Sequence, residues 1–376
     1  MKKSLHAIVL LFLITTAFPL ASGCKEDKNI TPRPKVEAKE ETGLITLSNT
    51  NIHVMGARYV SRTPAKLSFT RFSGQTLALP SEVRRFSTTY ALATTGISLQ
   101  FKTRSSSIHL TFSRESGMND SGSFQVLRDG VNFKTVEFVG AVNTPMQIEL
   151  NALPTDKEYV YEVILPCYTN VSLTKLELDG ESSLVTYVPT PKGIYISFGD
   201  SITHGAGQGG ATYLTYPFLL AQKLDMSLYN LAISGAKISI PMAETAKELP
   251  QADIITVLIG YNDFSSGNRT ATEIDNDYRL FLTEIRNNQP SAEIYCITAL
   301  YTTNTSNATT GMTAEELRDV VKDIVTEYQA TDNKLHLIEG DKIITSSAQL
   351  ADRVHLNVIG ASTLANGLYE KITDTE

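Results

Sequence analysis

The spacing of the apolar residues changes once along this chain, near residue 185, and this change constrains the fold more than any other feature. Before it, apolar and polar residues alternate, as at Ile97 and Leu99, and turn residues such as Asp129-Gly130 separate the alternating runs. A period of two broken by tight turns predicts antiparallel hairpins. No helical pattern of comparable strength interrupts them, so we expect an antiparallel β-sandwich over residues 48–184.

The second part of the chain follows the segment "VTYVPTPKG", whose prolines and glycine are typical of a domain boundary. Apolar runs and helical patterns alternate there, and capping boxes at Thr270 to Glu273 and at Thr313 to Glu316 open two amphipathic helices. This alternation predicts a parallel sheet wrapped by helices over residues 193–376. The expected strands are residues 194–198, 228–233, 254–259, 294–300 and 335–338.

Polar residues follow these strands where a ligand would bind. In open α/β sheets the ligand lies outside the carboxyl ends of the strands. The first strand ends in "GDS", which contains Asp200 and Ser201, the second is followed by Gly235, and the third is followed by Asn262. A final loop before the last helix reads "DRVH". We therefore expect these clusters to meet at one rim of the sheet.

The residue types at this rim are those that a serine nucleophile requires. Ser201 is the nucleophile candidate, and His355 is the base that would take its proton. Asp352 lies three residues earlier on the same loop and would orient the imidazole. The backbone N–H groups of Ser201 and Gly235 and the side-chain amide of Asn262 supply three donors for an oxyanion.

The blocks "GDSIT", "GxND" and "DxxH" resemble those of the SGNH or GDSL hydrolase superfamily, whose Ser, Gly, Asn and His would be Ser201, Gly235, Asn262 and His355. The resemblance covers roughly residues 193–374. It implies a three-layer α/β/α sheet of flavodoxin-like type, ester hydrolysis and no cofactor.

The same resemblance implies that Asp200 and Asp263 shape the site without joining the triad, although Asp263 could also simply cap a helix. The pairing of a sandwich with such a domain is similar to bacterial carbohydrate esterases that carry an N-terminal jelly-roll-like domain. The G-x-S-x-G elbow of α/β-hydrolases is absent, because residue 203 is threonine.

Other residues near the rim have more than one interpretation. His204 in "SITHG" is a rim residue, a second base or a substrate contact, and Tyr261 is either a packing residue or a ring on which a sugar stacks. Three further histidines stand in strand contexts without a histidine partner at ligand spacing, so we expect no metal site. They are His53, His109 and His336.

The N-terminus "MKKSLHAIVLLFLITTAFPLASGC" predicts an export signal over residues 1–23, too short to span a bilayer stably. The residues before Cys24 resemble a bacterial lipobox, which predicts acylation of Cys24; plain cleavage is the alternative. Residues 24–47 suit a flexible tether, and "KED" directly after the cysteine resembles a signal for the outer surface of the outer membrane. We expect an exported, surface-exposed lipoprotein that contacts the membrane through its anchor only.

The formal net charge of −7 provides no basic face, so a nucleic acid partner is not expected. The polar loops "ITHGAGQGGATYLTY" and "DFSSGNRTATE" favour a hydrated substrate and a small acyl group. These features together predict a serine esterase that removes O-acetyl groups from a carbohydrate through an acyl-enzyme. A lysophospholipase or thioesterase, and a non-catalytic glycan-binding lipoprotein, are the alternatives. The sequence leaves open the glycan, the acetylated position, the oligomeric state and the role of the sandwich.

Overall fold

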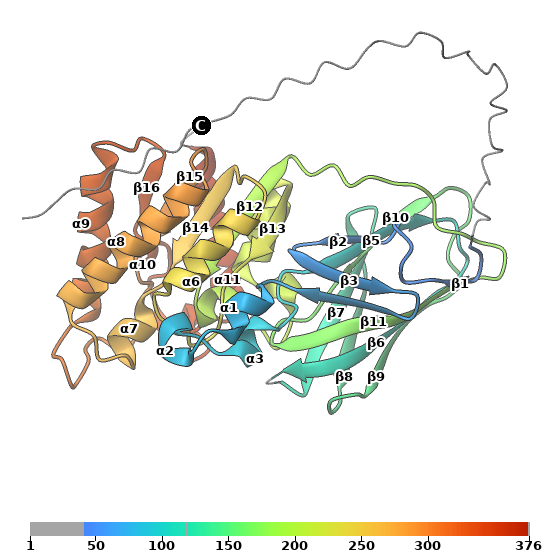
Figure 1. Cartoon of the computed structure of the whole chain (residues 1–376), viewed down its shortest axis with the longest axis horizontal. Helices are drawn as coiled ribbons and strands as arrows, with labels where there is room; N and C mark the ends of the chain where they lie inside the picture. The colour runs from blue at the N-terminus through green and yellow to red at the C-terminus, as the bar shows by residue number, and fades with distance from the viewer. Residues whose placement is uncertain (1–40, 118, 375–376) are drawn as a thin grey trace, which may run out of the picture. The chain divides into compact units, whose positions relative to one another are not determined.

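The computed structural model describes residues 41–117 and 119–374. The predicted signal peptide and the predicted lipidation site Cys24 lie outside the described residues. Two antiparallel sheets come first along the chain, and a parallel sheet flanked by helices follows (Figure 1). No helix within the described ranges is long and apolar enough to cross a membrane.

The two antiparallel sheets form the predicted β-sandwich. Alternate strand residues such as Leu99, Phe112 and Phe124 are fully buried in one core between them, as a period of two requires. The first sheet contains, in spatial order, β3 (Tyr59–Thr63), β4 (Lys66–Thr70), β11 (Thr169–Leu178), β6 (Ile108–Gly117) and β9 (Pro145–Leu150), with β1 (Leu44–Ile45) paired to β11. The second contains β2 (His53–Met55), β5 (Ser98–Thr103), β10 (Tyr159–Ile164), β7 (Ser121–Arg128) and β8 (Val131–Val139).

The sandwich begins earlier than the sequence predicted. Residues 44–47 were assigned to the tether, but β1 pairs with β11 and belongs to the first sheet. Ile45 and Leu47 are two residues apart, so both side chains reach the same face, and both are buried in the sandwich core. Burial of these two apolar side chains fixes a segment whose charged neighbours suggested a linker.

Three short helices interrupt the sandwich between β4 and β5, where no helix was expected. They are α1 (Gly74–Ala78), α2 (Ser81–Arg84) and α3 (Thr88–Ala91). Helices of four or five residues are too short to show a helical period in the sequence. Phe72, Phe86 and Ala91 from this segment are buried in the same core as the strands of the parallel sheet. The segment therefore joins the sandwich to the second part of the chain.

The parallel sheet has the strand order β13-β12-β14-β15-β16, which is the flavodoxin-like order. Neighbouring strands are parallel throughout, for example Ile196 beside Tyr229 and Ile255. Successive connections run to opposite sides of β12, so the topological switch point lies at its carboxyl end. The strands are β12 (Gly193–Gly199), β13 (Met226–Asn230), β14 (Ile254–Leu258), β15 (Glu293–Ile297) and β16 (Leu335–Ile338).

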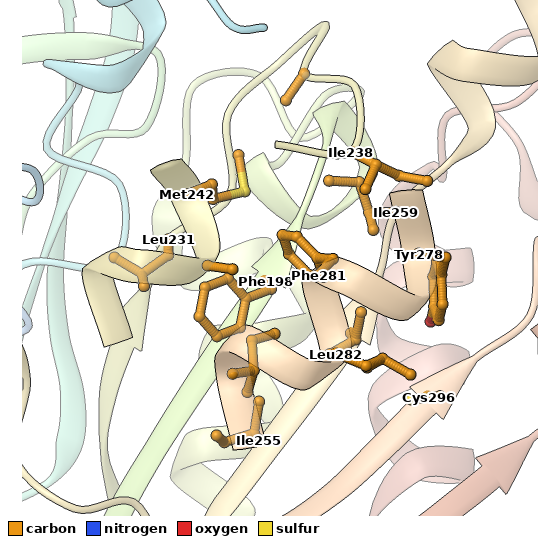
Figure 2. Close-up of a cluster of buried hydrophobic side chains, with 14 of the residues drawn as sticks. Phe198, Leu231, Ile238, Met242, Ile255, Ile259, Tyr278, Phe281, Leu282 and Cys296 are labelled. Atoms are coloured by element: carbon orange, nitrogen blue, oxygen red, sulfur yellow. The ribbon is translucent and has the colours of Figure 1, made fainter. Parts of the chain in front are cut away.

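Helices cover both faces of this sheet, which confirms the predicted three-layer arrangement. On one face α6 (Ile240–Glu244), α8 (Ala271–Asn288) and α9 (Ala314–Gln329) bury a core that contains Ile255 and in which the rings of Phe198 and Phe281 are neighbours (Figure 2). On the other face α5 (Tyr216–Leu224) and α11 (Val358–Thr373) bury a second core. Both predicted capping boxes are present.

Short helical turns complete the connections between the strands and the longer helices. They are α4 (Ser201–His204), η1 (Thr212–Leu214), η2 (Thr245–Glu248), α7 (Tyr261–Ser265), α10 (Gly340–Ile343) and η3 (Ser347–Gln349). Two of them, α4 and α7, begin directly past β12 and β14, at the rim where the sequence placed the functional residues.

Candidate active site

Ser201 stands at the switch point of the parallel sheet, as the first residue of α4. Asp200 caps this helix, because its Oδ1 accepts a hydrogen bond of 3.1 Å from the Ile202 N–H. Gly199 precedes it, and a Cβ at that position would clash with the Thr203 side chain. A glycine therefore lets the chain turn sharply from β12 into α4, which presents the serine at the rim.

Ser201, His355 and Asp352 form a continuous chain of hydrogen bonds. The Ser201 Oγ lies 2.8 Å from His355 Nε2, and His355 Nδ1 lies 2.6 Å from Asp352 Oδ2. With the Nδ1 proton facing the carboxylate, Nε2 is free to accept the serine proton. Burial alone would raise the pKa of Asp352, but its hydrogen bonds from the His355 ring and from the backbone of His355 and Val354 outweigh burial and lower it. The carboxylate therefore stays ionised beside the imidazole.

The loop that carries His355 is closed at both ends. The Ala351 N–H donates to the His355 carbonyl at 2.8 Å. The buried side chain of Gln208 donates to the Leu356 carbonyl at 2.7 Å. Gly207 has a φ of +85°, and any Cβ there would overlap the Leu356 carbonyl. A glycine at 207 is thus required for the close approach that holds the histidine toward Ser201.

The glycine-rich loop after Ser201, residues 205–212, does not have the role that the sequence predicted. We expected it to face a hydrated substrate, but most of residues 205–212 are buried. The Gly210 carbonyl accepts a hydrogen bond of 3.1 Å from the Cys167 N–H of the sandwich, and a Cβ at Gly210 would clash with Gly122 on β7. These glycines serve close backbone contact between the two parts of the chain. The loop therefore gives no argument about acyl length.

The three predicted oxyanion donors lie on neighbouring elements. Ser201 is at the first position of a helix, where a backbone N–H has no intrahelical partner. Gly235 has a φ of +73°, and the direction in which its Cβ would project opens onto free space. Asn262 lies on α7, and its Nδ2 donates to the Ala236 carbonyl at 3.0 Å. An amide nitrogen carries two hydrogens, so this contact orients the Asn262 side chain and leaves one hydrogen for a ligand.

Asp200 and Asp263 are buried acids close to these donors. Burial raises the pKa of Asp200 to about 7, against the lowering effect of the Ile202 N–H. Burial raises the pKa of Asp263 to about 6, while its hydrogen bond from the Ile238 N–H acts in the opposite direction. The 2.9 Å bond to Ile238 ties α7 to the segment after Gly235. Asp263 therefore links two loops of the site and does not cap a helix.

Two further residues were offered as substrate contacts, and the structure places them differently. His204 has no exposed surface, so it lies beneath the site and not on its rim, because α4 turns its ring toward the sandwich. Tyr261 is half-buried, and its hydroxyl lies 3.2 Å from Thr302 Oγ1 and accepts a hydrogen bond of 3.3 Å from Asn304 Nδ2. These bonds direct the Tyr261 hydroxyl to the loop after β15.

A further neighbour of the nucleophile, Tyr168, was not predicted from the sequence. This residue lies between β10 and β11, and its hydroxyl donates to the Ser201 carbonyl at 3.5 Å. It comes from the sandwich, in which no motif pointed to the hydrolase-like half. Only long-range packing brings it there.

A serine, a histidine and a carboxylate bonded in series at the rim of a three-layer α/β/α sheet define the fold and site of a serine hydrolase. Residues 197–362 match the family model described as "GDSL-like Lipase/Acylhydrolase family". The second part of the chain is thus a domain of this family.

Known structures share the arrangement of both parts. A salicylyl-acyltransferase from a tetracycline biosynthetic pathway has a TM-score of 0.77 at 18% identity, over 88% of this chain and 97% of its own. A family two carbohydrate esterase from Cellvibrio japonicus has a TM-score of 0.65 at 18% identity, over 89% and 98%. An acetyl xylan esterase from the rumen bacterium Butyrivibrio proteoclasticus has a TM-score of 0.59 at 14% identity, over 86% and 99%. No curated protein sequence matches the chain.

Proposed function

We propose that this hydrolase is a serine esterase that removes O-acetyl groups from a carbohydrate. Ser201 Oγ attacks the acetyl carbonyl while His355 Nε2 takes the serine proton. The oxyanion receives hydrogen bonds from the N–H groups of Ser201 and Gly235 and from the amide of Asn262. His355 passes its proton to the departing sugar oxygen, which leaves an acetyl-serine. Water, deprotonated by the same imidazole, then releases acetate and restores Ser201.

The observation that carries this proposal is the unbroken series of hydrogen bonds from Ser201 through His355 to Asp352, with the candidate oxyanion donors on α4, on the turn at Gly235 and on α7. A glycan-binding protein without catalysis needs no such series, which favours hydrolysis over that alternative. The carbohydrate part of the proposal is supported by similar structures described as a family two carbohydrate esterase and as an acetyl xylan esterase. Their sequence identity to this chain is 18% and 14%, so the similarity establishes the fold. The identity of the substrate is decided by experiment.

The deciding experiment measures acetate released from a panel of acetylated plant and microbial glycans. Acetate should appear in a one-to-one ratio with the ester groups lost, because water is the second acceptor in the proposed cycle. Loss of ester from the donor without free acetate would indicate transfer to another hydroxyl. No release from any acetylated glycan, together with cleavage of lysophospholipids or thioesters, would favour the alternative substrates.

The length of the acyl group separates the acetylesterase from a lipase. A long chain gains about 0.8 kcal/mol per CH₂ only where it can be buried against apolar surface. The groups hydrogen-bonded to Ser201 are polar, namely the His355 ring at its hydroxyl and the Tyr168 hydroxyl at its carbonyl. We expect kcat/KM for 4-nitrophenyl acetate to exceed that for the octanoate by at least about 10-fold. A kcat/KM that rises steadily with chain length would instead establish the lipase alternative.

We also propose that Cys24 is acylated and that the protein is an outer-membrane lipoprotein facing outward; the support comes from the sequence alone. A diacylated cysteine binds membranes stably, whereas a cleaved leader leaves no anchor. The full-length protein should fractionate with membranes, and Cys24→Ser should appear in the soluble fraction or remain unprocessed. A wild-type protein that is trimmed and soluble would contradict acylation. Protease treatment of intact cells then tests the outward orientation, since only an exposed protein is degraded.

A further inference from the structure

His204 is buried three residues after the nucleophile and makes a specific backbone contact. Its Nδ1 accepts a hydrogen bond of 3.1 Å from the Ser234 N–H. A histidine that accepts at Nδ1 is neutral and carries its proton on Nε2. Burial lowers the pKa of His204 well below its usual value, with the charge of Arg71 acting in the same direction. The ring therefore remains a hydrogen-bond acceptor at neutral pH.

The contact acts on the turn that carries an oxyanion donor. Ser234 and Gly235 are the central residues of a turn closed by a 3.0 Å bond from the Ala236 N–H to the Ile233 carbonyl. The φ of +73° at Gly235 is typical of the third residue of a type II turn. In such turns the central peptide, here Ser234–Gly235, can face either way, and its orientation decides where the Gly235 N–H points. The Ser234 N–H belongs to the preceding peptide, Ile233–Ser234, so its bond to His204 fixes the plane of that peptide, against which the central peptide takes its orientation.

The sandwich holds the His204 ring in place. Tyr168 stacks on it with ring centroids 4.3 Å apart and planes inclined by 19°. Tyr90 of α3 meets it edge to face at 6.1 Å. Burial raises the pKa of Tyr168 despite a hydrogen bond to the Ser234 side chain, so the hydroxyl remains a neutral donor near the same turn. Both aromatic rings belong to the N-terminal part of the chain.

Arg71 fixes the segment that precedes the turn at Ser234 and Gly235. Its side chain is buried between the two parts and donates to the Asn230 carbonyl at 2.9 Å and to the Ala232 carbonyl at 2.6 Å. These carbonyls lie at the end of β13 and two residues past it, and lead into Ser234. The same arginine donates to the carbonyls of Tyr90 and Ala91 on α3 and to that of Ala93 just after it. The turn is thus held by the N-terminal part of the chain at its entrance and, through His204, at Ser234.

From these contacts we infer that His204 is a positioning residue for the oxyanion hole, and that the sandwich completes the hole by clamping His204 with Tyr168 and Tyr90. The inference rests on the proposed esterase function and assigns the sandwich a part in it. His204 touches no reacting atom and acts through Ser234 and Gly235. A histidine that merely filled space would need only its ring, whereas a positioning histidine needs its Nδ1 acceptor.

Two variants separate the ring from the acceptor. His204→Phe keeps an aromatic ring for Tyr168 and loses Nδ1, whereas His204→Asn loses the ring and places an amide oxygen near the position of Nδ1. The measurements are kcat and KM for 4-nitrophenyl acetate, and Ki for phenylboronic acid, which mimics the tetrahedral oxyanion. The concentration of competent enzyme is taken from end-point labelling of Ser201 with a fluorophosphonate, so that misfolded protein does not count.

For His204→Phe we expect kcat per labelled site to fall at least about 10-fold, since loss of one oxyanion donor costs about 10²–10³ in kcat. The KM should be unchanged and the boronate Ki should rise by a similar factor, because only the transition state uses the donor. His204→Asn should recover most of the lost kcat. Wild-type kcat in the phenylalanine variant, or equal damage in both variants, would overturn the inference.

A measurement on the unaltered protein keeps the inference testable if either variant fails to fold. The ¹⁵N shifts of the His204 ring should show an unprotonated Nδ1 and a protonated Nε2 at neutral pH, and a proton on Nδ1 would refute the contact. Failure of the proposed function has a different signature: the wild-type enzyme would neither cleave the ester nor react with the fluorophosphonate at Ser201.

Discussion

Replacing Ser201 with alanine should lower kcat for 4-nitrophenyl acetate by about 10⁴-fold or more, because the attacking oxygen is lost and only binding and the oxyanion donors remain. Folding should be unaffected, since the Asp200 cap and the backbone contacts of α4 do not use the Ser201 hydroxyl. Steady-state rates and a thermal melt of both proteins measure the two expectations. Activity near the wild-type level in a folded Ser201→Ala protein would exclude Ser201 as the nucleophile.

Substitutions of His355 and Asp352, the other two residues of the hydrogen-bonded series, should lower kcat to different extents. His355→Ala should be nearly as severe as Ser201→Ala, because the base that takes the proton is absent. Asp352→Asn should retain more activity, since Asp352 orients the ring and is itself partly exposed, with 54% of its side chain accessible. Equal rates for the two variants, or a lower rate for Asp352→Asn, would show that the carboxylate does more than orient the imidazole.

Replacing Arg71 with methionine should lower the free energy of unfolding by about 3 kcal/mol or more. Methionine keeps much of the aliphatic volume, but five backbone carbonyls, four of them in buried contacts, lose a hydrogen-bond donor. The loss should appear as a lower midpoint in urea, and kcat should fall as well because Ala232 leads into the oxyanion turn.

The matched control is Arg104→Met. Arg104 also donates to backbone carbonyls, those of Thr155 and Asp156, but it is exposed and water can replace it. Its loss should change the free energy of unfolding by no more than about 0.5 kcal/mol. If Arg71→Met and Arg104→Met lower the urea midpoint equally, the buried hydrogen bonds of Arg71 contribute no more to the free energy of unfolding than those of an exposed arginine.

The sequence predicts the parts of the fold that are governed by local periodicity. Alternation at Leu99 and Phe112 predicted strands whose residues do meet in the sandwich core, and the capping boxes at Thr270 and Thr313 predicted α8 and α9. The residues placed at strand ends also came together, because carboxyl ends of parallel strands share one rim. Ser201 and His355 are 154 residues apart in sequence, and their nitrogen and oxygen atoms are 2.8 Å apart.

Features that depend on contact between distant segments were not predictable in this way. His204 and the glycine-rich loop look polar in the sequence and are buried, because a second layer of chain covers them. Tyr168 and Arg71 belong to runs that read as ordinary strand or loop, and their partners follow β12 and β13. The sequence of each helix or strand shows the period of its apolar residues, but it does not identify the surface against which that element packs.

The placement of Phe72, Phe86 and Ala91 affects how this architecture can be inherited. A domain that moves between genes as an independent module must bring its own core with it. Here three side chains encoded before the parallel sheet are part of the core on one face of that sheet, so a gene fragment beginning at residue 193 would encode a hydrolase with an unfilled interior. The esterase and acyltransferase structures that resemble this chain extend over both parts, as expected if the pair is retained or lost together.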